Sequence, residues 1–274
     1  MRPVDKKARR RTVTLGLGLC AAAAMQAAPA DLDEVTRRGT LRVLAVLVNQ
    51  QESFISARPG KGLDRELLEG FVALHHVTLT VVPVAGWDEL VPALLAGRGD
   101  TIAGRFTVTD ARKRQIDFTV EVFPTRNVVL TRKPHRVVTT LDELRKERVG
   151  TVRGTSMADA LTAARVPPSS VDDGIPTGTL PAALKAGRVT AIVLGVENAI
   201  ADRREDPDLQ LGAFIGPPGS LAWGVRKTDT RLREALDEYV SSVRRTPTWS
   251  RLVVKYFGEE APEILRKARA DDAP

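Results

Sequence analysis

"GRFTVTDARKRQIDF", residues 104–118, carries hydroxyl groups and a guanidinium where an apolar strand gives way to a helix. Thr107 and Thr109 stand just ahead of Arg112, and apolar residues return at Ile116. No nucleophile or metal ligand stands nearby, so these polar side chains point to a partner of another kind. The fold around this corner determines where they lie and what they contact.

Strand-like and helix-like runs alternate around the corner. Apolar β-branched runs predict buried strands, and apolar residues at helical spacing predict helices. The strands are expected at 41–48, 77–84 and 100–107, and the helices between them at 62–75 and 87–96. This order predicts an α/β fold with a mainly parallel sheet covered by helices.

The same alternation restarts in the second half of the chain. Strands are expected at 149–152 and 191–194, and helices at 157–165, 180–187 and 197–204. A helical tail, 228–257, carries an apolar stripe and is expected to pack back on the first half.

Two extended segments, 128–133 and 221–227, pass between the halves. Two crossings predict a second lobe that is inserted into the first. Lobe 1 is expected to contain residues 31–130 and 221–274, and lobe 2 residues 131–220.

Arg112 is the sharpest candidate for a binding residue. Open parallel sheets bind ligands beyond the carboxyl ends of their strands, and Thr107 and Arg112 follow the third strand there. A guanidinium can bind a carboxylate through two parallel hydrogen bonds, and the Thr107 hydroxyl could donate a third. The alternative is that Thr109 caps a short helix while Arg112 is a solvated surface charge.

A second corner has a similar composition. In Arg153-Gly154-Thr155-Ser156, the glycine permits a tight turn and a hydroxyl residue starts the next helix, with Asp159 placed to complete a capping box with Ser156. Plain helix capping would explain these residues as well. Two anion-binding corners, one in each lobe, could instead face each other across a cleft.

Residues 1–30 have the order of a secretory signal peptide. A basic start is followed by an apolar run of small residues and by Ala28-Pro29-Ala30, a pattern typical of a cleavage site. The apolar run is too short and too rich in Gly and Ala for a good membrane span. Arg10-Arg11 leaves twin-arginine export open beside the general secretory route. An uncleaved anchor or a disordered tail is the alternative, and Cys20 is expected to leave with the leader.

Removing the leader also removes most of the positive charge. The chain carries +7, of which residues 1–30 carry +5, so +2 remains for the rest. A nucleic-acid partner therefore loses its main support. The remaining chain has no cysteine, and its three histidines show no metal-ligand spacing. We therefore expect no metal, no cofactor and a fold held by its hydrophobic core alone.

Several short motifs follow one another in a fixed order: GWDEL (86–90), residues 94–100, 107–112 and 116–119, RVGTVRGTS (148–156), LKAGRVTAIV (184–193) and LAWGVRK (221–227). This series, which spans nearly all of the chain after the leader, resembles the bacterial family 3 extracytoplasmic solute-binding proteins. Those proteins serve ABC importers of polar amino acids. Within the family, AWGVRK and the late KYFG (255–258) most resemble the binding domain of membrane-bound lytic transglycosylase F. The sequence ends soon after Gly258, so we expect no transglycosylase catalytic domain.

The resemblance implies a type II periplasmic-binding-protein fold, with two α/β lobes joined by a two-strand hinge and a ligand enclosed between them. It implies that Arg112, helped by Thr107, clamps a ligand carboxylate. Ser156 would close over that carboxylate from lobe 2, with Thr155 beside it.

At two places the chain departs from the family pattern. Gly195 stands where amino-acid binders place an acid for the ligand ammonium, and Glu197 follows two residues later. The aromatic wall expected after the first strand falls near Gln51 and Glu52. Arg105 and Arg153 would add positive charge to the cleft or would lie at the surface.

The resemblance favours a monomeric, non-catalytic periplasmic protein that binds a small carboxylate-bearing solute, an amino acid or a related compound, for an ABC permease. One alternative is a sensory or cell-wall-associated binding module related to the lytic enzymes. Another is a dehydratase-like enzyme in which Glu52 or Glu197 acts as general base.

Overall fold

The computed structural model describes residues 31–47 and 62–270, and within these ranges the strands form two five-stranded sheets. The sheet of lobe 1 has the order β2-β1-β3-β10-β4. Its members are β1 (Thr40–Val46), β2 (Thr78–Val84), β3 (Thr101–Ile102), β4 (Asp117–Phe118) and β10 (Gly224–Val225). β1 pairs in parallel with β2 and β3, while β10 runs antiparallel to β3 and β4.

The sheet of lobe 2 has the order β7-β6-β8-β5-β9. It contains β5 (Phe123–Arg132), β6 (Val149–Gly150), β7 (Val171–Asp172), β8 (Ala191–Gly195) and β9 (Leu209–Leu221). β6, β7 and β8 are parallel, and β5 is antiparallel to both β8 and β9. Each lobe therefore combines parallel βα units with antiparallel returning strands.

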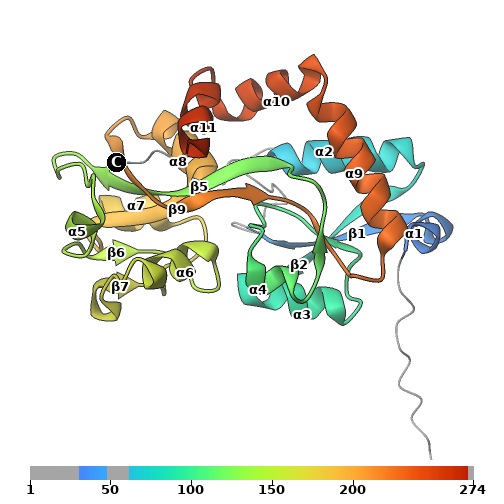
Figure 1. Ribbon diagram of the computed structural model, residues 1–274, viewed down its shortest axis with the longest axis horizontal. Coiled ribbons are helices and arrows are strands. Elements are labelled where there is room, and N and C mark those ends of the chain that lie inside the picture. Colours follow the sequence, from blue (N-terminus) through green and yellow to red (C-terminus); the bar gives the residue numbers. More distant parts are fainter. Residues whose placement is uncertain (1–30, 48–61, 271–274) are drawn as a thin grey trace, which may run out of the picture.

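Helices cover both sheets (Figure 1). Lobe 1 has α1 (Leu32–Arg38), α2 (Gly62–Leu74), the 3-10 turn η1 (Trp87–Glu89), α3 (Leu90–Leu95), α4 (Asp110–Lys113) and α9 (Thr230–Arg244). Lobe 2 has α5 (Leu141–Leu144), α6 (Ser156–Ala163), the 3-10 turn η2 (Pro168–Ser170), α7 (Leu180–Lys185) and α8 (Val196–Glu205). No helix within the described ranges is both long enough and apolar enough to cross a bilayer.

The chain passes between the lobes twice, through adjacent extended segments. Thr119 N donates to Trp223 O at 2.9 Å, and Val122 N donates to Leu221 O at 2.9 Å. β5, which begins at Phe123, already pairs within the sheet of lobe 2. The two crossings therefore run side by side as a pair of extended segments that continue into β5 and β9.

The C-terminal helices α10 (Pro247–Phe257) and α11 (Ala261–Arg269) extend across both lobes (Figure 1). α10 packs against α2 and α9 of lobe 1 and also reaches α8, while α11 packs against α8, β5 and β9 of lobe 2. The expected return of the tail, residues 228–257, to lobe 1 is seen for α9 and in part for α10, which also contacts α8 of lobe 2. Apolar side chains on α10 and α11, such as Phe257 and Leu265, join one buried cluster that both lobes share.

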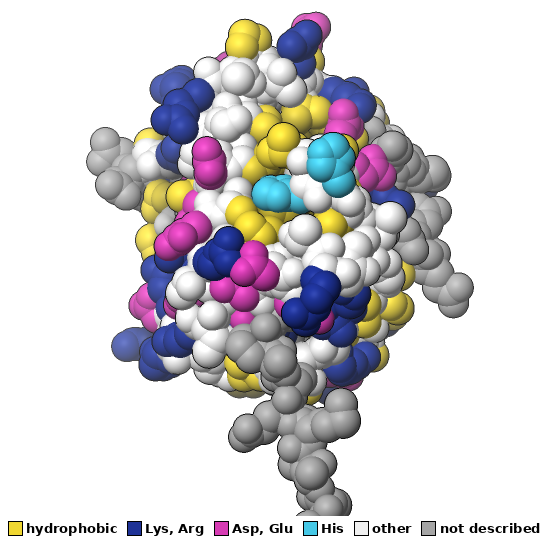
Figure 2. Space-filling view, turned by 90° about the vertical axis from the view of Figure 1, so that its right-hand side faces the viewer, with side chains coloured by type: hydrophobic (Ala, Val, Ile, Leu, Met, Phe, Trp, Pro, Cys, Tyr) yellow, Lys and Arg dark blue, Asp and Glu magenta, His cyan; other side chains and the backbone are white. Residues whose placement is uncertain are grey.

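The core otherwise follows the layers of the two sheets. A second apolar cluster lies on the other face of the lobe-1 sheet, around Leu44, Leu90 and Phe106. A third lies in lobe 2, around Val129 and Leu161. On the end of lobe 1 shown in Figure 2, basic and acidic side chains are interspersed, and no single-sign field develops there.

Candidate functional site

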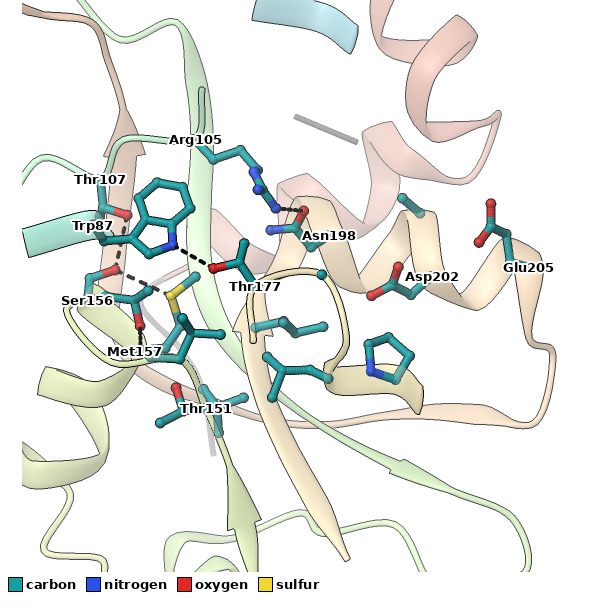
Figure 3. A pocket seen from close by; sticks show the side chains of 18 of the residues that line it. Trp87, Arg105, Thr107, Thr151, Ser156, Met157, Thr177, Asn198, Asp202 and Glu205 are labelled. Carbon is teal, nitrogen blue, oxygen red and sulfur yellow. Dashed lines mark hydrogen bonds between the residues drawn. The ribbon is translucent and has the colours of Figure 1, made fainter. Parts of the chain in front are cut away.

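A cavity that is partly open to solvent lies between the lobes. Lobe 1 contributes four lining residues, which are Trp87, Arg105, Thr107 and Arg112. Lobe 2 contributes the remaining wall, made of Thr151, Val152, Thr155, Ser156, Met157, Thr177, Gly178, Leu180, Pro181, Val193, Leu194, Asn198, Ala201, Asp202 and Glu205. The cavity therefore brings the two polar corners of the sequence together (Figure 3).

The corner of lobe 1 places Arg112 at the cavity wall. Thr109 is the N-cap of α4, and its hydroxyl accepts from Arg112 N at 3.3 Å. Thr109 thus caps the helix, as one alternative predicted, while Arg112 lies at the cavity wall, as the other predicted. The Arg112 guanidinium lies 4.1 Å from the centre of the Phe106 ring, which supports the flat face of the cation. Its Nη1 donates to Thr107 O at 2.8 Å.

Arg112 also reaches the other lobe. Its Nη2 lies 3.4 Å from the carbonyl oxygen of Gly154, a weak donated bond. Burial lowers the pKa of Arg112 to about 10, against the opposing charge of Asp159. The side chain therefore stays cationic at neutral pH in a poorly solvated place, where an anionic partner gains most from it. A guanidinium has five N–H donors, so two contacts do not exhaust it.

The corner of lobe 2 supplies hydroxyls and a close backbone approach. The N-cap of α6 is Thr155, whose hydroxyl accepts from Ala158 N. Of the two residues that could start the helix, it is therefore Thr155 that caps it, and Ser156 is the first residue of α6. Ser156 Oγ lies 3.0 Å from Thr107 Oγ1 across the cleft (Figure 3). Gly154 has φ +74°, and a Cβ there would lie 3.0 Å from Asp88 N of lobe 1. The lobes thus meet tightly, and glycine makes the approach possible.

Arg105 crosses the cleft beside Trp87 (Figure 3). Arg105 Nη1 donates to Asn198 Oδ1 at 3.0 Å, and its guanidinium lies 5.5 Å from the Trp87 ring centre. Trp87 Nε1 in turn donates to Thr177 Oγ1 at 3.3 Å. Both contacts join lobe 1 to lobe 2, so the structure is a closed arrangement of the lobes.

The backbone of Arg105 is held in an uncommon conformation. Its φ is +64°, in the left-handed region, and its N–H donates to Asp64 Oδ2 at 3.1 Å. The other carboxylate oxygen of Asp64 accepts from Trp223 Nε1 at 2.8 Å. Burial raises the pKa of Asp64, while these hydrogen bonds oppose the shift. A buried carboxylate therefore braces the corner from the interior of lobe 1.

Glu197 is completely buried and is absent from the residues that line the cavity. It accepts from Thr125 Oγ1 at 2.7 Å and from Asn198 Nδ2 at 3.0 Å. A Cβ on Gly195 would collide with this carboxylate. Glu197 thus folds back into the space where a side chain at position 195 would begin. Burial raises its pKa, and the hydrogen bond from Thr125 and the charge of Arg105 act in the opposite sense.

Arg153 lies outside the cavity. Its Nε and Nη2 donate to Asp173 at 3.0 and 2.9 Å, and the side chain is 73% exposed. Gln51 and Glu52, which fall in the region of the expected aromatic wall, lie outside the described residues. Among the described residues, no group of three or more His, Cys, Asp or Glu could hold a metal ion.

Most other cavity residues escaped the reasoning from sequence, among them Trp87, Thr177 and Asn198. Trp87 reads as an ordinary apolar residue at the start of a helix, and Thr177 lies in an irregular segment. Asn198 belongs to a face of α8 that also carries Ala201, Asp202 and Glu205. Spacings of three and four residues place those side chains on one helix face, and this signal was available in the sequence.

Comparison with known families gives a match over most of the chain. The profile of the bacterial extracellular solute-binding proteins, family 3, matches residues 49–259. The chain is 26% identical over 219 residues to a membrane-bound lytic murein transglycosylase F of Desulfosudis oleivorans, an alignment that covers 76% of this chain and 47% of that protein. It is also 26% identical over 180 residues to the histidine-binding periplasmic protein of Escherichia coli K12, covering 62% and 69% of the two chains.

The fold has close counterparts among solved structures. A mutant of ArgBP from T. maritima superimposes with a TM-score of 0.73 at 25% sequence identity, covering 83% of this chain and 99% of that one. This likeness confirms the predicted α/β fold of type II, with two lobes and a two-strand connection. The chain spans about half the length of the transglycosylase that it matches.

Proposed function

Because this chain belongs to the bacterial extracellular solute-binding proteins of family 3, we propose that it captures a small carboxylate-bearing solute between its two lobes for delivery to an ABC importer. The solute is an amino acid or a related compound. The observation that carries the proposal is the convergence of Arg112 and Thr107 from lobe 1 with Ser156 from lobe 2 at one cavity.

Each group has a defined part in the proposed binding. Arg112 supplies a planar fork of N–H donors that matches the two oxygens of a carboxylate. The hydroxyls of Thr107 and Ser156 exchange their mutual hydrogen bond for bonds to the same anion. Closure of the lobes then removes water from the ion pair, which strengthens it. The proposal contains no catalytic step.

The test is calorimetric titration with a panel of amino acids and dicarboxylates. We expect at least one of them to bind the wild type, and Arg112→Ala to weaken that binding by about 2–5 kcal/mol, because the carboxylate loses a buried charged partner. Arg188→Ala is a matched control. Arg188 forms an ion pair with Asp172, with 2.7 Å between Nε and Oδ2, and neither residue lines the cavity. Absence of binding across the panel, or unchanged affinity in Arg112→Ala, would contradict the proposal.

Export and assembly belong to the same proposal. Residues 1–30 act as an export leader, and the mature protein works in the periplasm as a monomer beside an ABC permease. The similarity to relatives such as the histidine-binding periplasmic protein of Escherichia coli supports this location. Intact mass of the protein recovered from the periplasm tests the leader, because cleavage after residue 30 removes a defined mass. Recovery of the full-length chain there would contradict it.

A second candidate function is a cell-wall-associated binding module without transport. The similarity to transglycosylase F over 76% of this chain favours it. Its ligand would be a peptide or a muropeptide fragment. Adding such fragments to the same titrations separates the two functions, since binding of fragments in preference to free amino acids and dicarboxylates supports the wall-associated module.

A further inference from the structure

Arg105 lines the cavity between the lobes, where a ligand of this protein would lie. The side chain comes from lobe 1 and ends on Asn198 of lobe 2, with the Trp87 ring along one side (Figure 3). Its direction is fixed because Asp64 binds the backbone N–H of the same residue. These contacts hold the guanidinium in one position within the cleft, unlike the charge of a mobile surface arginine.

The negative charges on this side of the cleft act on Arg105. Glu197 and Asp202, from the first two turns of α8, favour its charged form, as does Asp64 beneath the corner. Burial lowers the pKa of Arg105 against these charges. The Arg105 guanidinium is thus a resident cation beside the α8 wall, supplied by the protein itself.

A cationic group of a ligand at this place would meet two obstacles. It would lie beside the Arg105 guanidinium, and like charges in a poorly solvated cleft repel strongly. It would also compete with Arg105 for the same carboxylates and for Asn198. A group that accepts hydrogen bonds meets the opposite situation, because Arg105 Nε is buried and has no hydrogen-bond partner among the described residues.

The geometry points to Arg105 as the residue that sets ligand class: the cleft selects carboxylic acids that carry no ammonium group, such as dicarboxylic acids, over the amino acids of the same skeleton. This inference rests on the proposed function, since Arg112 must first hold one carboxylate. In such a complex Arg112 binds the first carboxylate, and Arg105 Nε donates to an oxygen at the other end. The resident cation takes the place that a ligand ammonium would need.

Matched pairs of probes test the inference by calorimetric titration. The pairs are succinate with L-aspartate and glutarate with L-glutamate, which differ in the ammonium group, and L-arginine is added as a cationic probe. For the wild type we expect the acid of each pair to bind at least about tenfold more tightly than the amino acid. Arg105→Ser should reverse or abolish this preference, with a gain in affinity for the amino acids.

Two further variants separate selectivity from folding. Arg105→Lys keeps the positive charge and should keep the preference for the acid, whereas Arg188→Ser, at a surface ion pair, should leave both affinities unchanged. Thermal unfolding of each variant shows whether it is folded before its affinities are compared. Retained preference in a folded Arg105→Ser protein would overturn the inference.

The outcomes distinguish this inference from the proposed function. If the wild type binds the amino acid of each pair more tightly and Arg112→Ala abolishes that binding, the proposed function stands and the role of Arg105 is wrong. If no acid and no amino acid binds, both fail together. Binding of the acid that depends on both arginines supports both.

Discussion

The lobe-1 corner around Arg105 is held by a buried carboxylate, whereas the lobe-2 corner around Gly154 is held by backbone geometry. Asp64 fixes the first corner by accepting hydrogen bonds from Arg105 N and Trp223 Nε1. The second corner depends on a positive φ at Gly154 and on the Thr155 cap. The two lobes thus supply different chemical groups to the cavity: the arginines Arg105 and Arg112 come from lobe 1, whereas lobe 2 supplies hydroxyls, an amide, main-chain groups and the carboxylates of α8.

Removing the brace of the lobe-1 corner should have the largest effect on stability. Asp64→Ala leaves the Trp223 indole N–H and the Arg105 N–H buried without an acceptor, so we expect the free energy of unfolding to fall by about 2–4 kcal/mol. Asp64→Asn keeps one acceptor oxygen and should lose less. Urea unfolding of the three proteins provides the measurement. A loss in Asp64→Ala no greater than in Asp64→Asn would show that the hydrogen bonds do not hold the corner.

Breaking the lobe-2 corner should affect both stability and closure. Gly154→Ala puts a Cβ on a residue with φ +74° and within 3.0 Å of Asp88 N across the cleft. Gly187→Ala is a matched control in the same lobe, with φ +72° and nothing within 4 Å of the added Cβ. Both should lose about 1–2 kcal/mol of stability from backbone strain.

Only Gly154→Ala should also weaken binding, because its new methyl group lies between the lobes. Titration of both variants with the acid that binds the wild type most tightly measures this difference. An equal affinity for the two variants would mean that the lobes do not close through this contact.

Much of the fold could be predicted from sequence, because hydrophobic periodicity is a local signal. The β1–α2 and β8–α8 units appear within a residue or two of their expected bounds. The third strand is only two residues long, since the chain after Ile102 turns to form the cleft corner. α11 escaped prediction because its short apolar stripe is buried by elements of lobe 2 that are distant in sequence.

The side chains of the site were harder to predict than the fold. Thr107, Arg112, Thr155 and Ser156 follow strand ends, and strand ends can be located from the pattern. The direction of an arginine depends on its partners across space, and the sequence does not reveal them. Arg105 turns inward to Asn198, while Arg153 turns outward to Asp173.

The buried acid beneath the α8 wall offers a smaller, pH-dependent test. The pKa of Glu197 is raised by burial, so the folded protein holds this proton over a range of pH in which the unfolded chain has lost it. The contribution of Glu197 to stability therefore declines as the pH rises from the ordinary carboxyl range through the raised pKa. Glu197→Gln removes this titration. Relative to wild type, the variant should gain stability as the pH rises above the ordinary range of a glutamate carboxyl group, and chemical unfolding over a series of pH values measures the gain.

The charge of Arg105 opposes the shift at Glu197, so the same experiment links the two sides of the cleft. In an Arg105→Ser background, the pKa of Glu197 should rise further. The advantage of Glu197→Gln at high pH should then be larger than in the wild type. If the gain in stability from Glu197→Gln is the same with and without Arg105, the two groups do not interact. The charge of Arg105 would then have no effect on the α8 wall of lobe 2.

The smallest effect is expected at Arg153. Like Arg105 and Arg112, it is an arginine that follows the end of a strand. Its guanidinium is committed to a forked contact with Asp173 in solvent, and exposed pairs of this kind contribute little. Arg153→Ala should therefore change ligand affinity by less than about twofold. Titration beside Arg112→Ala gives the contrast directly. A loss in Arg153→Ala comparable with that in Arg112→Ala would require the Asp173 contact to break when ligand binds, and lobe 2 would then contribute a cation to the site, contrary to the division between the corners.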